Sequence, residues 1–404
     1  MATGSGKFPQ MHPVSGFRLG TASAGIKTPG RKDLVVMELS ESASVAAVFT
    51  QNAFCAAPVT VAKQHLQAGA PRYLLINTGN ANAGTGETGL ADAYQSCEVL
   101  GNLQSVAAAK TLPFSTGVIG EPLPMDTLLA GIPKAIEALD ENGWAEAAEG
   151  ILTTDTRPKG SSLQYRLDSS QETVTMTGIT KGSGMIKPNM ATMLGFVATD
   201  AEVDPELLHR ALRLVSNKSF NRITVDSDTS TNDAVVLAAT GASGVVIDES
   251  NFDQFVVNLE KVFIELAQSI IRDGEGASKF VSVVVDSAVD SAEAVKVAYC
   301  IAESPLVKTA LAASDANWGR ILAAVGRAGV EHLDVNKVTV SLNGVLIVEQ
   351  GGRAASYTEQ AGEQAMAAED ITIQVSLNRG TAIETVWTTD LTYEYVRINA
   401  EYRT

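Results

Sequence analysis

Positive charge and aromatic side chains are scarce in this 404-residue sequence. Thirty Lys and Arg stand against 46 Asp and Glu, which gives a net charge of −16. A surface with that balance repels phosphate backbones, so nucleic-acid binding is not expected. Aromatic residues make up only 5% of the chain, whereas glycines number 34. This composition favours tight turns and small-residue packing over aromatic stacking platforms.

Long apolar runs and paired cysteines are also missing. No run approaches the roughly 20 apolar residues that a membrane span requires, and Met1–Gly16 lacks the apolar centre of a secretory signal. The cysteines Cys55, Cys97 and Cys300 are odd in number, widely separated and without a C-x-x-C pair. They are typical of free thiols in a reducing compartment. We therefore expect a cytoplasmic protein that does not cross a membrane.

Hydrophobic residues make up 45% of the sequence, which is enough for a large core. They are arranged in alternating strand and helix patterns. Short Val- and Leu-rich or alternating runs predict strands at Leu34–Leu39, Ser44–Phe49, Tyr73–Ile76, Gln164–Leu167, Thr173–Met176, Met193–Thr199, Ile371–Leu377 and Ala382–Thr388. Helical spacing or start signals predict helices at Leu90–Lys110, at Met125–Glu149, from Asp204-Pro205 onward, and at Phe252–Arg272. Lys337–Val348 reads as a hairpin that turns at Asn343-Gly344. Together these patterns predict a mixed α/β sandwich whose sheets are covered by helices.

A glycine motif, Gly84-x-Gly86-x-x-Gly89, superficially matches a dinucleotide-binding fingerprint. However, the polar stretch Asn77–Asn82 separates it from the preceding strand, and no acidic residue lies about 20 positions further on to bind a ribose hydroxyl. We interpret the segment as a surface loop rich in Asn and Gly that packs closely against another backbone.

Metal and phosphate motifs are incomplete. The stretch Asp226-x-Asp228-x-Ser230-x-Asn232 begins like a calcium loop, but Thr231 replaces the turn glycine and Leu237 replaces the bidentate Glu. We interpret its polar side chains as satisfying the backbone groups of a turn. Gly4-Ser5-Gly6-Lys7 lacks most of a phosphate loop. The histidines are isolated from one another and from the cysteines, so no metal site is predicted; they are His12, His65, His209 and His332.

The most unusual stretch is Lys181–Leu194, with the sequence KGSGMIKPNMATML. A loose glycine-rich approach and a Pro-Asn corner lead there into a stiff apolar strand. Such a layout could present a threonine hydroxyl at the beginning of a strand. From the residues alone, a glycine-rich turn that enters a core strand is a more common explanation than a nucleophile site.

This stretch closely resembles the hallmark of the ornithine acetyltransferase family, the bifunctional glutamate N-acetyltransferase/amino-acid acetyltransferases of arginine biosynthesis. Other blocks resemble the same family in the same order over nearly the whole chain: Asn77–Gly84, Ser115–Gly120, Thr153–Thr156, Asp273–Gly276 and Asn399–Thr404.

The resemblance implies an N-terminal-nucleophile-like fold and a precursor that cuts itself between Ala191 and Thr192. Residues 1–191 would form an α chain and residues 192–404 a β chain that begins with the nucleophile Thr192. This chemistry is coherent, because a threonine hydroxyl needs a base beside it. Cleavage creates such a base on the same residue, an α-amino group whose pKa is about 7.7–8.0.

The resemblance also implies the roles of individual residues. Thr116 and Gly117 correspond to the family's oxyanion site. The substrate-contacting positions are Thr154, Lys181, Thr192, Glu275, Asn399 and Thr404. Lysine, hydroxyl and amide groups suit substrate carboxylates, and the carboxylate of Glu275 suits the ammonium of ornithine.

The implied substrates are N-acetylornithine and glutamate, and the implied assembly is an α2β2 heterotetramer without a cofactor. A bifunctional enzyme would also use acetyl-coenzyme A as a co-substrate, and the sequence does not separate the two versions. One alternative is a self-processing amidohydrolase or aminopeptidase with the same threonine nucleophile. Another is a non-enzymatic nucleotide-binding or scaffolding α/β protein with an intact chain.

Overall fold

The computed structural model of the chain describes residues 2–4, 6–26, 28–168, 172–187 and 193–401. Packing divides the chain into two units. The larger unit comprises Lys7–Asn221 and Asp228–Ile270. The smaller unit comprises Met1–Gly6, Arg222–Ser227 and Ile271–Tyr402. The predicted cleavage point falls within the sequence range of the larger unit.

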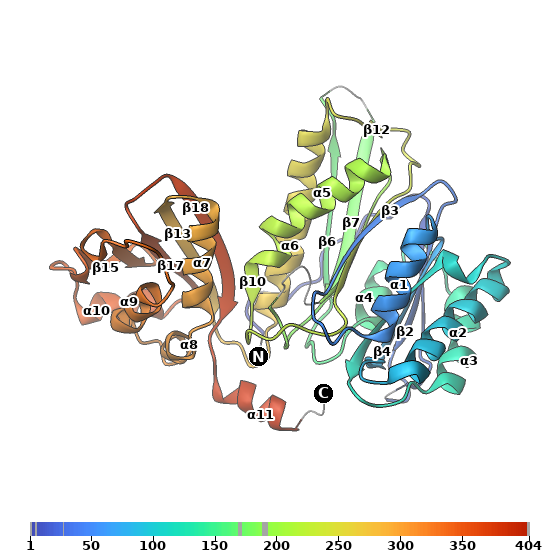
Figure 1. Cartoon of the computed structure of the whole chain (residues 1–404), viewed down its shortest axis with the longest axis horizontal. Coiled ribbons are helices and arrows are strands. Elements are labelled where there is room, and N and C mark those ends of the chain that lie inside the picture. The colour runs from blue at the N-terminus through green and yellow to red at the C-terminus, as the bar shows by residue number, and fades with distance from the viewer. Residues whose placement is uncertain (1, 5, 27, 169–171, 188–192, 402–404) are drawn as a thin grey trace. The chain divides into compact units, whose positions relative to one another are not determined.

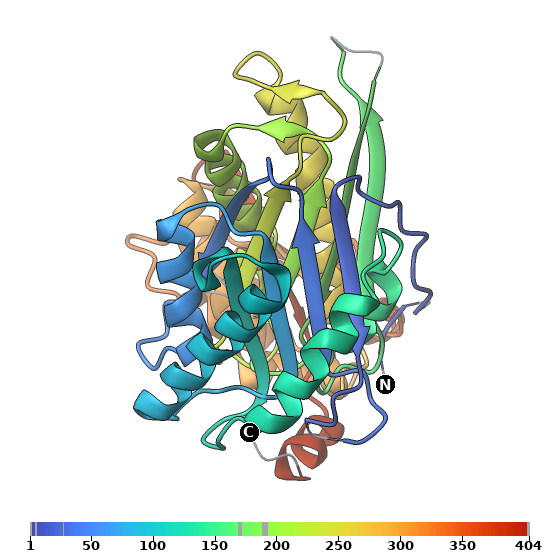
Figure 2. The same cartoon turned by 90° about the vertical axis from the view of Figure 1, so that its right-hand side faces the viewer.

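One sheet of the larger unit has the strand order β1-β2-β4-β5, in which β4 and β5 run parallel and the other neighbours run antiparallel. Its strands are β1 (Phe17–Ala22), β2 (Leu34–Leu39), β4 (Tyr73–Asn80) and β5 (Thr111–Val118). Helices cover one face of this sheet (Figure 2). They are α1 (Ala57–Ala68), α2 (Gly86–Gln104) and α3 (Met125–Glu137), with the short helix η1 (Ala108–Lys110) after α2.

The other large sheet of this unit has the order β3-β11-β8-β7-β6. Its strands are β3 (Ser44–Phe49), β6 (Lys159–Arg166), β7 (Thr173–Lys181), β8 (Leu194–Thr199) and β11 (Ala234–Ala239). The helices α5 (Pro205–Lys218) and α6 (Phe252–Arg272) lie along this sheet (Figure 1). The remaining elements of the unit are α4 (Trp144–Gly150) and the short strands β9 (Glu202–Val203) and β12 (Val246–Ile247), with η2 (Phe220–Arg222) at its border.

The two sheets of the larger unit pack face to face. Alternate residues of their strands share one buried core, in which the rings of Phe114 on β5 and Phe196 on β8 meet edge to face at 5.2 Å. The other residues of β7 and β8 point to the opposite side, where the Leu266 side chain of α6 lies against Gly178. The layers are therefore helix, sheet, sheet and helix, which confirms the predicted sandwich of helix-covered sheets.

The smaller unit is built on a sheet of order β10-β18-β13-β17-β14-β15-β16. Its strands are β10 (Ile223–Thr224), β13 (Phe280–Ala288), β14 (Thr339–Leu342), β15 (Val345–Glu349), β16 (Gly352–Arg353), β17 (Asp370–Ser376) and β18 (Ala382–Thr389). The helices are α7 (Ser291–Ala302), α8 (Pro305–Ala312), α9 (Trp318–Gly326), α10 (Glu359–Met366) and α11 (Tyr393–Glu401), with the turn η3 (Val335–Lys337). Residues from α7 to α10 share one core with the sheet. The predicted hairpin is confirmed, since Asn343 and Gly344 join β14 to β15 with φ values of 46° and 82°.

Most predicted elements are confirmed, and three have the predicted bounds: β2, β3 and α6. The Asp204 carboxylate also caps α5 as expected, by accepting the Glu206 N–H at 2.9 Å. The single helix predicted at Met125–Glu149 is wrong, because α3 ends at Glu137 and α4 begins at Trp144. The chain turns between them so that Asp140 exchanges two backbone hydrogen bonds with Leu19 at 2.9 and 3.1 Å. Pairing with a distant strand thus overrides the local helical pattern.

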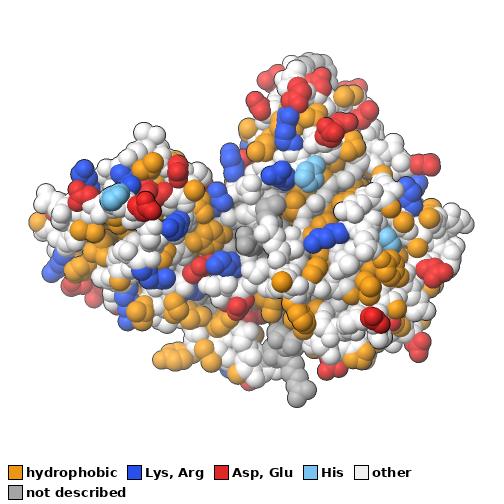
Figure 3. Space-filling model, viewed as in Figure 1, with side chains coloured by type: hydrophobic (Ala, Val, Ile, Leu, Met, Phe, Trp, Pro, Cys, Tyr) orange, Lys and Arg blue, Asp and Glu red, His pale blue; other side chains and the backbone are white. Residues whose placement is uncertain are grey.

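The surface chemistry is mixed. On the face shown in Figure 3, acidic and basic side chains are interspersed among polar and apolar ones. Among the described residues, every helix is too short or too polar to cross a lipid bilayer.

Candidate active site

Gly117 lies near the end of β5, where its backbone packs tightly against β4. It pairs with Gly79, beside an irregularity in the register at Asn80. A Cβ atom on Gly117 would lie 2.3 Å from the carbonyl carbon of Gly79, and the φ of Gly117 is 140°. Both facts require glycine. The residues Thr116 and Gly117 therefore belong to the end of a strand.

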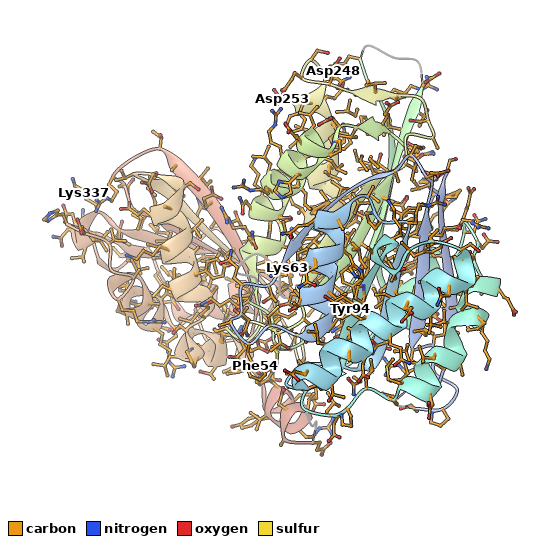
Figure 4. All side chains as sticks on the ribbon, turned by 45° about the vertical axis from the view of Figure 1, so that its right-hand side comes forward. Phe54, Lys63, Tyr94, Asp248, Asp253 and Lys337 are labelled. Atoms are coloured by element: carbon orange, nitrogen blue, oxygen red, sulfur yellow. The ribbon has the colours of Figure 1, made fainter. Side chains whose placement is uncertain are left out.

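Asn77 and Asn80 at the end of β4 and Asn82 after it are buried, whereas Gly84 and residues 86–88 are exposed. The interpretation of the glycine motif as a surface segment therefore holds, but the asparagines before it belong to the interior. The Asn77 amide donates to the Asn80 carbonyl at 2.9 Å, and the Asn82 amide donates to the Gly89 carbonyl at 2.8 Å. The strand itself continues to Asn80, closer to the glycines than predicted. Close packing does explain Gly89. A Cβ on Gly89 would meet the Thr85 hydroxyl, and Gly84 lies against the exposed ring of Phe54, which Figure 4 shows in the loop before α1.

The loop before β11 joins the two sheets of the larger unit through Asn232. The buried Asn232 amide donates to the carbonyl of Ala81 at 2.5 Å and to that of Ser115 at 2.9 Å, directly beside Thr116. Within the loop, the Ser230 hydroxyl accepts the Asn232 N–H at 3.2 Å. These contacts confirm the structural interpretation of the calcium-like stretch. They also show a residue next to the site that the sequence interpretation did not single out.

Lys181 and Thr116, two predicted site residues of the larger unit, are in direct contact. It ends β7, is 9% exposed, and its ammonium donates to the Thr116 hydroxyl oxygen at 3.3 Å. Lys181 also pairs with Leu194 on β8, and Leu194 lies two positions after Thr192 in the sequence. The intervening Met193 is fixed by its carbonyl, which accepts the Ala234 N–H at 2.9 Å. Ala191 and Thr192 themselves lie outside the described residues.

Asp155, next to the predicted substrate residue Thr154, is the central buried acid of this region. One of its carboxylate oxygens accepts the Lys159 ammonium at 2.6 Å and the Gly182 N–H at 2.7 Å, and the other accepts the Thr153 N–H at 3.1 Å. Burial opposes ionisation of Asp155, but the charges of Lys159 and Lys181 and the two hydrogen bonds to Oδ1 outweigh it and hold the pKa well below its usual range. Asp155 was missed as a functional residue. The i, i+4 spacing of Asp155 and Lys159 was the available signal.

A second buried acid, Asp233, behaves in the opposite way. Burial raises its pKa well above the usual range, although hydrogen bonds to Ser230 and the charge of Lys181 work against that shift. Within the described part of the chain, its Oδ2 atom has no hydrogen-bond partner. The pKa values of the two buried acids are therefore shifted in opposite directions, that of Asp233 upward and that of Asp155 downward.

Two further predicted residues, Glu275 and Asn399, lie in the smaller unit. The Asn399 amide on α11 donates to the Glu275 carboxylate at 2.7 Å, so these two predicted positions are in direct contact. The loop of Glu275 packs on the start of α11, since the Thr392 hydroxyl donates to the Gly276 carbonyl at 2.7 Å and the Asp390 carboxylate accepts the Ser278 N–H at 2.8 Å. Thr404 lies outside the described residues.

Lys308 on α8 fixes the chain that leads into α11. Its buried ammonium donates to the Thr388 hydroxyl at 2.9 Å and to the Thr389 carbonyl, and its own carbonyl accepts the Leu391 N–H at 3.1 Å. Burial lowers the pKa of Lys308 to about 8, despite the opposing charges of nearby carboxylates. The segment that carries Asn399 is thus tied to the core of the smaller unit.

The comparisons with known proteins identify the family. The model of the ArgJ family matches residues 18–404. This chain belongs to the ArgJ family. The match confirms the resemblance to the ornithine acetyltransferase family, and it spans all of the predicted site positions, from Thr116 to Thr404.

Individual ArgJ proteins support the same assignment. The chain is 57% identical over 408 residues to the arginine biosynthesis bifunctional protein ArgJ of Pseudomonas syringae pv. tomato, with 100% of both chains covered. It is 54% identical over 395 residues to the ArgJ protein of Methylococcus capsulatus, covering 97% of this chain and 96% of that one. A solved structure of the argJ protein of Bacillus halodurans is 40% identical with a TM-score of 0.50, covering 52% of this chain and 100% of that one.

Among the described residues of this ArgJ family member, no group of three or more His, Cys, Asp and Glu side chains is placed to hold a metal ion. What the larger unit does offer is a strand end with a glycine N–H, a threonine hydroxyl and a buried ammonium. Such groups are suited to stabilise an oxyanion and to bind a carboxylate.

Proposed function

We propose that this chain is a self-cleaving acetyltransferase of arginine biosynthesis, which moves the acetyl group of N2-acetylornithine to glutamate and yields ornithine and N-acetylglutamate. The observation that carries the proposal is the 3.3 Å contact between Lys181 and Thr116, because Lys181 also pairs with Leu194, which lies two positions after Thr192 in the sequence. Membership of the ArgJ family and the names of its relatives give that contact its functional meaning.

The first chemical event is cleavage of the chain. In the proposed step, the Thr192 hydroxyl attacks the carbonyl carbon of Ala191, and the peptide nitrogen leaves as the new α-amine of Thr192. Water then hydrolyses the resulting ester, which gives residues 1–191 a terminal carboxylate and restores the hydroxyl. The free α-amine, with a pKa of about 7.7–8.0, is partly neutral at working pH and acts as the base for that hydroxyl. The solved argJ chain of Bacillus halodurans matches over all of its own length but covers 52% of this chain, a share close to that of residues 192–404.

Acetyl transfer follows in two halves. Thr192 attacks the acetyl carbonyl of N2-acetylornithine and ornithine leaves; the amine of glutamate then attacks the acetyl-threonine ester. Each half passes through a tetrahedral oxyanion, for which Gly117 N–H and the Thr116 hydroxyl are the proposed donors. The contact with Lys181 favours this role. Because the Thr116 oxygen accepts from an ammonium, its own hydrogen can point elsewhere as a donor.

Lys181, with Thr154 nearby, suits a substrate carboxylate, and Glu275, held by Asn399, suits the ammonium of ornithine. We further propose an α2β2 assembly in the cytoplasm that needs no cofactor, and acetyl-coenzyme A as a second acetyl donor in line with the bifunctional names of the relatives.

Denaturing mass spectrometry tests the proposal most directly. Wild type should give two chains, one starting at Thr192, whereas Thr192→Ala should give one uncut and inactive chain and Thr192→Ser should still be cut. Fully active enzyme consisting of a single unbroken chain would refute the mechanism.

Product analysis separates transfer from hydrolysis. With N2-acetylornithine as donor, adding glutamate should shift the product from acetate to N-acetylglutamate. A product ratio that ignores glutamate would instead indicate the amidohydrolase alternative, and N-acetylglutamate formed from acetyl-coenzyme A alone would establish the bifunctional activity.

A further inference from the structure

Two lysines, Lys159 and Lys181, act on the buried carboxylate of Asp155. The side chains of Lys159 and Asp155 are 1% and 0% exposed and lie 2.6 Å apart. The same Asp155 oxygen accepts the N–H of Gly182, the residue after Lys181. Asp155 thus holds the backbone next to Lys181, while its charge is met by the ammonium of Lys159.

Lys181 uses its own ammonium differently. That group donates to the Thr116 hydroxyl oxygen at 3.3 Å, although the Asp155 carboxylate is close enough for its charge to be felt. A buried carboxylate without a partner is strongly unfavourable, so it pairs with the nearby ammonium group that has the best geometry. If Lys159 were absent, Lys181 would be the cation available to Asp155, and its ammonium would be drawn away from Thr116.

We propose that Lys159 is a positioning residue that neutralises Asp155 and so keeps the ammonium of Lys181 directed at Thr116 and available to the carboxylate of the substrate. This inference rests on the proposed function, which assigns Lys181 to substrate binding. Lys159 itself touches neither the substrate nor the reacting atoms. Its action is electrostatic, through Asp155, and this distinguishes it from a lysine that only stabilises the fold.

The test is a set of variants compared by steady-state kinetics of acetyl transfer. Lys159→Met should raise KM for the substrate whose carboxylate Lys181 holds by about 10- to 100-fold, the loss expected for one charge-assisted hydrogen bond. The double variant Asp155→Asn/Lys159→Met removes both charges and keeps an acceptor for the Gly182 N–H. It should recover most of the lost affinity, and Lys159→Arg should stay close to wild type.

Two control variants isolate the effect. Lys218→Met removes a lysine from an ion pair on the surface of the same unit, with Glu260 at 3.3 Å, and should leave KM unchanged. Lys181→Met should raise KM at least as much as Lys159→Met. Mass spectrometry and thermal unfolding of each variant show whether it is cleaved and folded.

The outcomes distinguish the proposed role of Lys181 from the inferred role of Lys159. An unchanged KM in Lys181→Met would overturn the role given to Lys181 in the proposed function. A raised KM in Lys181→Met together with an unchanged KM in Lys159→Met would overturn only the inference about Lys159. If Lys159→Met does not fold, the double variant decides. A KM near wild type supports the inference, and a KM as high as that of Lys181→Met refutes it.

Discussion

Replacing Gly117 by alanine tests the closest backbone contact of the proposed site. The new Cβ would lie 2.3 Å from the Gly79 carbonyl carbon and 2.5 Å from the Asn80 nitrogen, so the strands must separate by about 1 Å to restore ordinary contact. Such overpacking costs about 1–3 kcal/mol. The φ of 140° adds strain of about 1–3 kcal/mol for a residue with a side chain.

The expected result is a drop in Tm of about 4–12 °C, at about 2 °C per kcal/mol for a unit of this size. Gly120→Ala is the matched control, because Gly120 also has a positive φ of 82° but no atom within 4 Å of the added Cβ. It should lose only about 1–2 kcal/mol. Scanning calorimetry measures both variants, and equal Tm values for the two would refute the steric reasoning.

The same variant tests the oxyanion assignment. Moving the Gly117 N–H by about 1 Å should lower kcat by about 10²–10³ in the folded, cleaved enzyme, the effect of losing one oxyanion donor. A folded Gly117→Ala enzyme with wild-type kcat would show that Gly117 serves the packing of β4 and β5 and not the reaction.

Because the pKa of Lys308 is lowered to about 8 from 10.5, the unfolded chain binds a proton that the folded chain releases between these pH values, and the free energy of unfolding gains a contribution that rises with pH. The Tm difference between wild type and Lys308→Met should therefore move in favour of wild type from pH 7.5 to pH 9.5, and a constant difference would contradict this. Asp204→Ala should lower the free energy of unfolding in urea by about 1 kcal/mol through loss of the cap on Glu206, whereas Asp204→Asn should be nearly neutral. A tag added after Thr404 should raise KM for the substrates relative to the same tag at the N-terminus; equal KM values would remove Thr404 from the site.

The strands and helices could be predicted wherever local pattern and tertiary packing agree. The run Phe252–Arg272 has one continuous apolar stripe, and α6 has the same bounds. The helix predicted across residues 125–149 failed because the pairing of Asp140 with Leu19 is a contact between distant segments, which no local pattern encodes. The burial of Asn77, Asn80 and Asn82 was missed for a similar reason, since their amides satisfy backbone groups that only the fold brings near.

The candidate site shows the same limit. The resemblance to the ornithine acetyltransferase family was enough to propose Thr116, Lys181, Glu275 and Asn399, and two contacting pairs among them are seen, one in each unit. Asp155 escaped notice because an aspartate beside a lysine at i+4 usually forms a solvent-exposed pair. Only the fold shows that this pair is buried and adjacent to Gly182.

Under the proposed cleavage, the strand order β3-β11-β8-β7-β6 has a consequence for how the mature enzyme refolds. A cut between residues 191 and 192 assigns β3, β6 and β7 to one product and β8 and β11 to the other, so the two polypeptides are interleaved in a single hydrogen-bonded sheet. Once cut, the protein no longer refolds as a single molecule. The precursor folds as one molecule, whereas denatured mature enzyme must bring two partners together, and its recovery should fall on dilution while that of an uncut variant does not.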